Sequence, residues 1–156
     1  MLQKFPEPKK LLLGLNPVAC MKRYSNISTP EKAFETGFVK LNELAKIYNN
    51  NTPVFLIEAW LNNLELFLGF EKNKNSAQIS EIAYLMYREI HFLNIAELTL
   101  LFTRFKSGYY GEYFGSINGP NLIRWCREYR LERGKIVAKQ PTTDFNAIAE
   151  KIKQLL

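Results

Sequence analysis

Hydrophobic residues recur along most of this chain at alternating intervals of three and four, which is the period of an amphipathic helix. The stretch Thr29–Tyr48 opens with a Thr-Pro-Glu start signal and carries this period throughout. The next stretch, Thr52–Leu68, is apolar around most of its circumference and ends at Gly69, which is typical of a helix in the centre of a bundle. Its tryptophan, Trp60, is therefore predicted to lie in the core.

Four more helices are predicted from the same period. They are Ala77–Ile90 after a Ser76 cap, Ile95–Lys106 after an Asn94 cap, a helix that begins at Gly119-Pro120 and weakens at Gly134, and a short last helix capped by Thr143 or Asp144. Their charged positions are expected on solvated faces, among them Glu97 and Arg104, as are Glu58 and Glu65 of the preceding helix. No alternating β run or internal repeat is present. The predicted class is all-α, a compact bundle of about five to six helices.

Three regions are predicted: an N-terminal arm (1–28), a helical core domain (29–138), and a C-terminal linker with a short helix (139–156). The arm contains three prolines and no sustained period. Its leucines between Leu11 and Leu15 are apolar and are expected to be buried against another surface. Two interpretations stay open, an arm packed across the domain surface and a peptide that docks onto a partner.

Composition narrows the class of protein. With 156 residues, 47% of them hydrophobic, the chain is long enough for one domain with its own core. Cys20 and Cys126 lie far apart and His91 is the only histidine, so no zinc site, disulfide framework or other cofactor is predicted. The Leu11–Leu15 run is too short to span a membrane, and we expect a cytoplasmic protein. The net charge of +6 favours anionic partners without specifying them.

No catalytic signature is present: the chain has no Walker loop, no Rossmann glycine fingerprint and no serine elbow. Four glycines fall between the fourth and fifth predicted helices at spacings of three, four and four, which indicate turns and close packing instead of a phosphate-binding loop. We therefore expect binding and no enzymatic activity.

The same Gly/Tyr-rich loop is the best candidate for a binding site, and its β-favouring residues Tyr109–Ile117 are compatible with a short hairpin. Aromatic rings stack on bases and cations neutralise phosphates, while the same residue types are hot spots of protein interfaces. Alternatively, the aromatic residues pin the loop to the bundle and the arginines solvate its rim. The candidate residues are Arg104, Lys106, Tyr109, Tyr110, Tyr113, Arg124 and Arg127.

The stretch Phe102–Arg133 also carries a pattern of fixed spacing, F-x-x-F-K-x-G-x-Y-G-x-x-[YF]-G-x-[IV]-[ND]-G, followed by a looser I-x-x-W-x-x-x-Y-x-x-E-R. This pattern resembles one in uncharacterised small helical proteins of bacterial mobile elements and phages. It covers about the last half of the helical core, and Phe114 stands where the family has tyrosine. The resemblance transfers no catalytic residues.

The resemblance implies an accessory factor similar in size and helical character to replicative helicase loaders. The function expected is that of a small basic adaptor of DNA replication or mobile-element biology, which binds a replication protein, DNA or both through the loop. The alternative is a phage- or element-encoded inhibitor or regulator that binds a host protein without contacting nucleic acid.

Overall fold

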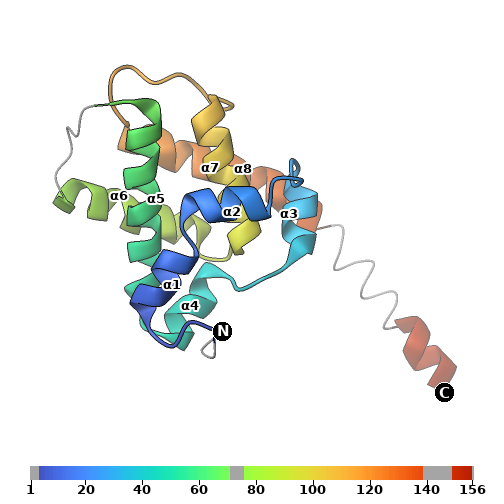
Figure 1. Cartoon of the computed structure of the whole chain (residues 1–156). Helices are drawn as coiled ribbons and strands as arrows, with labels where there is room; N and C mark the ends of the chain where they lie inside the picture. The colour runs from blue at the N-terminus through green and yellow to red at the C-terminus, as the bar shows by residue number, and fades with distance from the viewer. Residues whose placement is uncertain (1–3, 71–75, 139–148, 156) are drawn as a thin grey trace.

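One helix of the fold is nearly buried, and three other helices pack directly against it (Figure 1). The computed structural model describes residues 4–70, 76–138 and 149–155. Its helices are α1 (Pro8–Gly14), α2 (Pro17–Arg23), α3 (Pro30–Thr36), α4 (Leu41–Ile47), α5 (Thr52–Leu68), α6 (Ser76–Ile90), α7 (Ile95–Ser107) and α8 (Gly119–Val137). The nearly buried helix is α7, against which α2, α3 and α5 pack. Helices α1, α4 and α6 pack against α5, and α8 packs against α3 and α6.

The all-α prediction is confirmed for the described residues, which contain no strand and a single isolated bridge between Lys40 and Asn94. The predicted number of helices, five to six, is wrong. Among the residues that the structure describes, eight helices precede residue 139, and residues 149–155 are also helical, away from the bundle (Figure 1). The short hairpin with which the loop was compatible does not form, because residues 109–118 contain only bends and irregular backbone.

Two of the additional helices form where an arm was expected. Pro8 and Pro17 begin α1 and α2, and the side chain of Asn16 caps α2 by accepting a hydrogen bond from the Ala19 amide at 2.9 Å. Leu11 and Leu15 are buried, and the Leu15 carbonyl accepts a 2.9 Å hydrogen bond from the indole N–H of Trp60. These leucines are therefore part of the hydrophobic core.

Another additional helix arises because the predicted helix Thr29–Tyr48 is broken in two. Gly37 has a φ of +43°, and the chain then runs extended to Lys40 before α4 begins. The Leu41 amide donates to the Leu93 carbonyl at 2.9 Å, which holds the start of α4 beside the junction of α6 and α7. Long-range hydrogen bonds therefore override the continuous helical period.

Other helix boundaries agree with the sequence. Gly69 and Gly108 adopt left-handed conformations with φ of 72° and 73° and end α5 and α7. Asn94 caps α7 in a capping box with Glu97. Trp60 is 1% exposed and meets the ring of Phe102 edge-on at 5.4 Å, so its predicted place in the core is confirmed.

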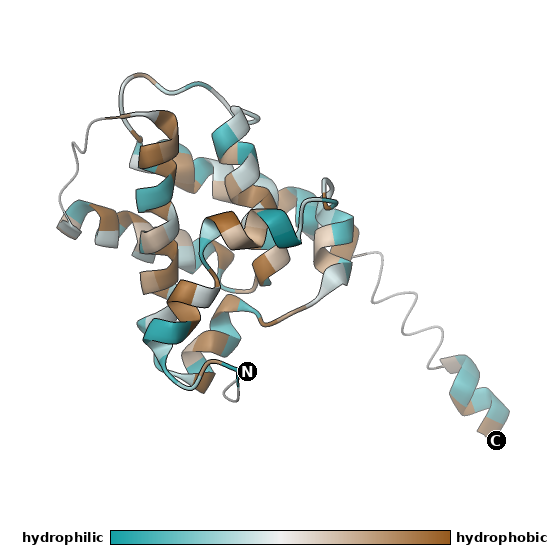
Figure 2. Cartoon of the chain, viewed as in Figure 1, coloured by the Kyte–Doolittle hydropathy of each residue, from teal (hydrophilic) through white to brown (hydrophobic). Residues whose placement is uncertain are grey.

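Hydrophobic positions extend along α5 to its C-terminal end (Figure 2). There they leave the core, and Leu66 and Phe67 are 80% and 59% exposed. Within the described ranges, none of the helices has both the length and the apolar character needed to cross a membrane.

The burial of α1 generates a matched pair of substitutions. Leu11→Ala removes a fully buried side chain, so we expect the free energy of unfolding in a urea titration to fall by about 2 to 5 kcal/mol. Leu13→Ala, on the exposed side of the same helix, should change it by no more than about 0.5 kcal/mol. Equal effects of the two substitutions would show that α1 does not pack as described.

Candidate interaction site

The aromatic loop between α7 and α8 is held against one side chain of α8, Trp125. The Tyr110 ring stacks on the indole at 6.1 Å with 18° between the planes, and the Tyr113 ring meets it edge-on at 5.5 Å. The Tyr113 hydroxyl also donates to the Phe105 carbonyl at 3.0 Å. A Cβ at Gly111 would lie 3.1 Å from Trp125 Cζ2, so the backbone approaches the indole closely. Tyr110 and Tyr113 thus anchor the loop.

Arg104 is also part of the fold and lies inside it. It is 7% exposed, and its guanidinium donates to Glu132 at 2.8 Å and to the Tyr110 hydroxyl at 3.0 Å. Burial by itself lowers the pKa of Arg104, but these hydrogen bonds raise it above its ordinary value. Burial raises the pKa of Tyr110 to about 12. This cation is therefore paired internally and faces no open surface.

The exposed aromatic residues of the loop are Tyr109 and Phe114, which are 60% and 87% exposed. The Arg104 guanidinium lies 4.3 Å from the centroid of the Tyr109 ring and holds it by a cation–π contact. The Tyr109 ring is therefore accessible to solvent while it contacts the buried Arg104 side chain. The aromatic residues are divided between anchoring and exposure: Tyr110 and Tyr113 pin the loop to the bundle, and binding by the exposed Tyr109 stays a prediction.

Arg124 and Arg127 lie on the outer face of α8, as the helical period predicts. Arg124 donates to the side chain of Asn121 at 2.8 Å. Arg127 forms an ion pair with Glu89 of α6 at 3.0 Å, and the same carboxylate accepts from Arg130 at 3.2 Å. One acid therefore neutralises part of the positive charge on this face.

Lys106 points away from these arginines, toward α2 and α5. Its ammonium lies 3.3 Å from the sulfur of Met21 and 5.3 Å from the centroid of the Phe67 ring. Burial lowers the pKa of Lys106. The seven predicted site residues therefore do not share one set of neighbours. Lys106 contacts α2 and α5, whereas Arg124 and Arg127 contact Asn121 and Glu89. Arg104, Tyr110 and Tyr113 are engaged within the fold, and Tyr109 is exposed.

A shallow groove of about 610 Å³ lies where Lys106 meets α2 and α5. We call it the α2–α5 groove; its walls include Val18, Met21 and Lys22 of α2, Leu66 and Phe67 of α5, and Lys106 of α7. Sequence reasoning missed the contribution of α2 and α5. Leu66 follows Asn62 by four residues and so lies beside the narrow polar strip of α5. That position alone does not decide exposure, because Leu66 is exposed and Glu65 on the same strip is buried.

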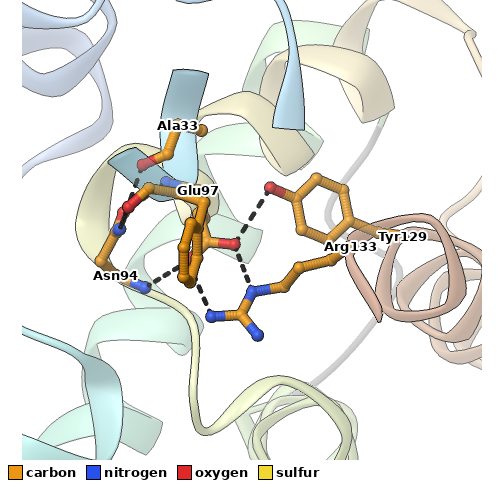
Figure 3. A network of polar contacts seen from close by, with 6 residues as sticks. Ala33, Asn94, Glu97, Tyr129 and Arg133 are labelled. Atoms are coloured by element: carbon orange, nitrogen blue, oxygen red, sulfur yellow. Dashed lines mark hydrogen bonds and ion pairs between the residues drawn. The ribbon is translucent and has the colours of Figure 1, made fainter. Parts of the chain in front are cut away.

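A second polar cluster joins three helices beneath the surface (Figure 3). Glu97 is fully buried, and its carboxylate accepts three kinds of hydrogen bond. The donors are the Arg133 guanidinium at 2.6 Å, the backbone amide of Asn94 at 3.2 Å and the Tyr129 hydroxyl at 3.4 Å. The side-chain amide of Asn94 donates to the Ala33 carbonyl at 3.1 Å. The cluster therefore ties α3, α7 and α8 together, and its groups satisfy one another.

The predicted solvated positions of Glu97, Arg104 and Glu65 are thus wrong. The first two are covered because α2, α3 and α5 pack against α7 and because α8 supplies their ionic partners, Arg133 for Glu97 and Glu132 for Arg104. Glu65 is 6% exposed, and its Oε1 is buried without a hydrogen-bond partner among the described residues; its backbone carbonyl accepts from the Phe70 amide after the turn at Gly69. Glu58 is half-buried and accepts a hydrogen bond from the Ser80 hydroxyl of α6.

The cysteines and the histidine belong to different parts of the fold: Cys20 to α2, Cys126 to α8, and His91 to the residues just after α6. Burial raises the pKa of the Cys20 thiol to about 11 and also raises that of Cys126, so both thiols are protonated at neutral pH. His91 is exposed at the junction of α6 and α7, with its ring against Phe92. In the part of the chain that the structure describes, no three potential metal ligands of the His, Cys, Asp or Glu type gather together.

Comparison with known proteins finds no match: no family model, no curated protein and no solved structure matches this chain. The resemblance of Phe102–Arg133 to mobile-element and phage proteins therefore stays a prediction from the sequence.

Breaking the buried cluster should destabilise the whole bundle. We expect Glu97→Gln to lower the free energy of unfolding by about 3 to 5 kcal/mol, because it leaves the largely buried Arg133 guanidinium without a counter-charge. Glu128→Gln, on an exposed position of α8, should cost no more than about 0.5 kcal/mol. Urea titrations followed by circular dichroism measure both, and a loss below about 1 kcal/mol for Glu97→Gln would contradict this role.

Proposed function

We propose that this chain is a small adaptor of DNA replication or mobile-element biology that acts by binding a protein partner at the α2–α5 groove. The observation that carries the binding proposal is the exposure of Leu66 and Phe67 on consecutive positions of α5, beside Val18, which is 54% exposed. Exposed apolar side chains around a hollow are typical of protein interaction sites. The replication setting rests on the resemblance of the Phe102–Arg133 stretch.

Two observations favour a protein over DNA as the main partner. Arg104 is buried, and Arg127 shares the Glu89 carboxylate with Arg130, so much of the charge expected to meet phosphates is already paired. The groove, by contrast, has apolar walls. These observations also favour the second candidate function, a regulator that binds a host protein and no nucleic acid.

The partner proposal is tested with the replicative helicase of the bacterium that encodes the chain or hosts its element. We expect the two purified proteins to form a complex in size-exclusion chromatography. Phe67→Ser should weaken it about tenfold or more, because removal of a central aromatic anchor typically costs at least about 1.4 kcal/mol. Tyr84→Ser is the matched control, since Tyr84 is similarly exposed (54%) and lines a separate hollow on α6. Absence of a complex would remove the helicase as the partner.

Binding to DNA is tested by changing the charge of the outer α8 face in both directions. Arg124→Ala combined with Arg127→Ala should weaken retention of duplex DNA and flatten its salt dependence, by a slope of about 0.9 for each phosphate that the variant no longer neutralises. Glu89→Gln should strengthen retention of duplex DNA and steepen its salt dependence, because it releases Arg127 and Arg130 from their shared carboxylate. Filter binding across a salt series measures both slopes. DNA affinity that responds to neither change would exclude this face as the DNA-binding surface and favour the regulator.

A further inference from the structure

The α2–α5 groove continues beyond its first hollow. A second hollow of about 240 Å³ shares Met21 and Ser25 with it and extends over Leu100 of α7. Apolar atoms form most of the surface of both hollows, although Lys22, Asn63 and Lys106 also line the first. The lining thus suits a segment that inserts successive apolar side chains, whereas a planar surface would meet only the rim.

The groove carries positive charge and no negative charge. Lys22 and Lys106 belong to its walls, and no acidic residue lines either hollow among the residues that the structure describes. The four ion pairs found within the same ranges involve neither lysine. The ammonium of Lys106 has a sulfur and an aromatic ring as neighbours, so it lacks a counter-ion. A partly desolvated cation of this kind is complementary to a carboxylate supplied by a partner.

The groove also includes an unsatisfied acceptor. The side-chain oxygen of Asn63 is buried and has no hydrogen-bond partner within the described part of the chain. A buried acceptor without a donor costs about 1 to 3 kcal/mol, so this end of α5 carries an energetic cost inside the fold. The largely apolar surface and the unpaired cations of the groove together describe a polypeptide ligand.

The chain itself is a poor occupant of this groove. Its net charge of +6 opposes the approach of a second copy. The helical residues 149–155 expose Ile152, but they contain two lysines and one glutamate and so carry a net positive charge, 2 − 1 = +1. Neither a second copy nor residues 149–155 therefore carries the net negative charge that would complement Lys22 and Lys106.

From these features we infer that the α2–α5 groove binds an acidic amphipathic helix of a partner protein. Its apolar side chains, spaced i, i+3 or i+4, and i+7, contact Leu66, Phe67 and Met21, and its carboxylates pair with Lys22 and Lys106. This inference rests on the proposed function, that the chain acts by binding a protein, and specifies the chemistry of the segment bound.

The test uses a random peptide library displayed on phage and selected against the full chain. We expect the enriched peptides to combine Asp or Glu with large apolar residues at helical spacing. A selected peptide is then synthesised with a fluorescent label, and its affinity is measured by fluorescence anisotropy. Phe67→Ser and the double variant Lys22→Glu/Lys106→Glu should each weaken binding about tenfold or more, and Tyr84→Ser should leave it within about twofold.

A charge swap distinguishes pairing from general electrostatic attraction. A peptide with its acidic residues changed to lysine should bind the parent chain poorly and regain affinity for Lys22→Glu/Lys106→Glu. Circular dichroism melting curves confirm that each variant is folded. Because Phe67, Lys22 and Lys106 lie at the surface of the groove, these variants are expected to fold.

Four results would overturn the inference. They are enrichment of peptides without acidic residues, binding that Phe67→Ser leaves intact, sedimentation with phosphatidylglycerol vesicles that Phe67→Ser abolishes, and a concentration-dependent dimer that the same variant no longer forms. The last two identify a membrane surface or a second copy as the occupant.

If acidic peptides bind the groove and the helicase does not, the replication proposal fails and this inference stands. If the helicase binds and Lys22→Glu/Lys106→Glu does not weaken that binding, the replication proposal stands and this inference fails.

Discussion

The burial of the Glu97 carboxylate is the constraint on which the arrangement of the bundle depends. A carboxylate with no exposure to solvent is costly unless charges and hydrogen bonds replace the water it loses. Glu97 obtains them from three sources: the Arg133 guanidinium of α8, the Asn94 amide at the start of α7, and the Tyr129 hydroxyl. Its position in the first turn of α7 also places it at the positive end of the helix dipole. These requirements fix how α8 lies against α7.

The same cluster reaches the N-terminal half of the chain. Asn94 caps α7 and also donates to the Ala33 carbonyl of α3, and the guanidinium of Arg133 lies 5.0 Å from the centroid of the Phe34 ring. With α3 fixed in this way, the chain must turn at Gly37 to bring α4 alongside the junction before α7. The break in the predicted Thr29–Tyr48 helix therefore follows from long-range hydrogen bonds around Asn94.

The loop between α7 and α8 is organised by packing. Trp125 receives Tyr110 on its face and Tyr113 at its edge, and Gly111 permits the approach of the backbone. These contacts partly bury Tyr110 and Tyr113 and leave Tyr109 and Phe114 exposed, whereas the exposed apolar side chains that surround a hollow lie at the α2–α5 groove. There Lys106 is the one predicted site residue that lines the hollow.

Local signals in the sequence determined the helical class, the caps at Asn94, Gly69 and Gly108, and the burial of Trp60, because each depends on neighbours within one or two helical turns. The outward direction of Arg124 and Arg127 followed from helical period alone. Only the tertiary structure decided that Glu97, Glu65 and Arg104 are buried, since a polar strip on a helix is covered or exposed according to what packs on it. It also decided that Lys106 faces Phe67 and Met21, because that contact joins residues 39 and 85 positions apart in the chain (106 − 67 = 39; 106 − 21 = 85).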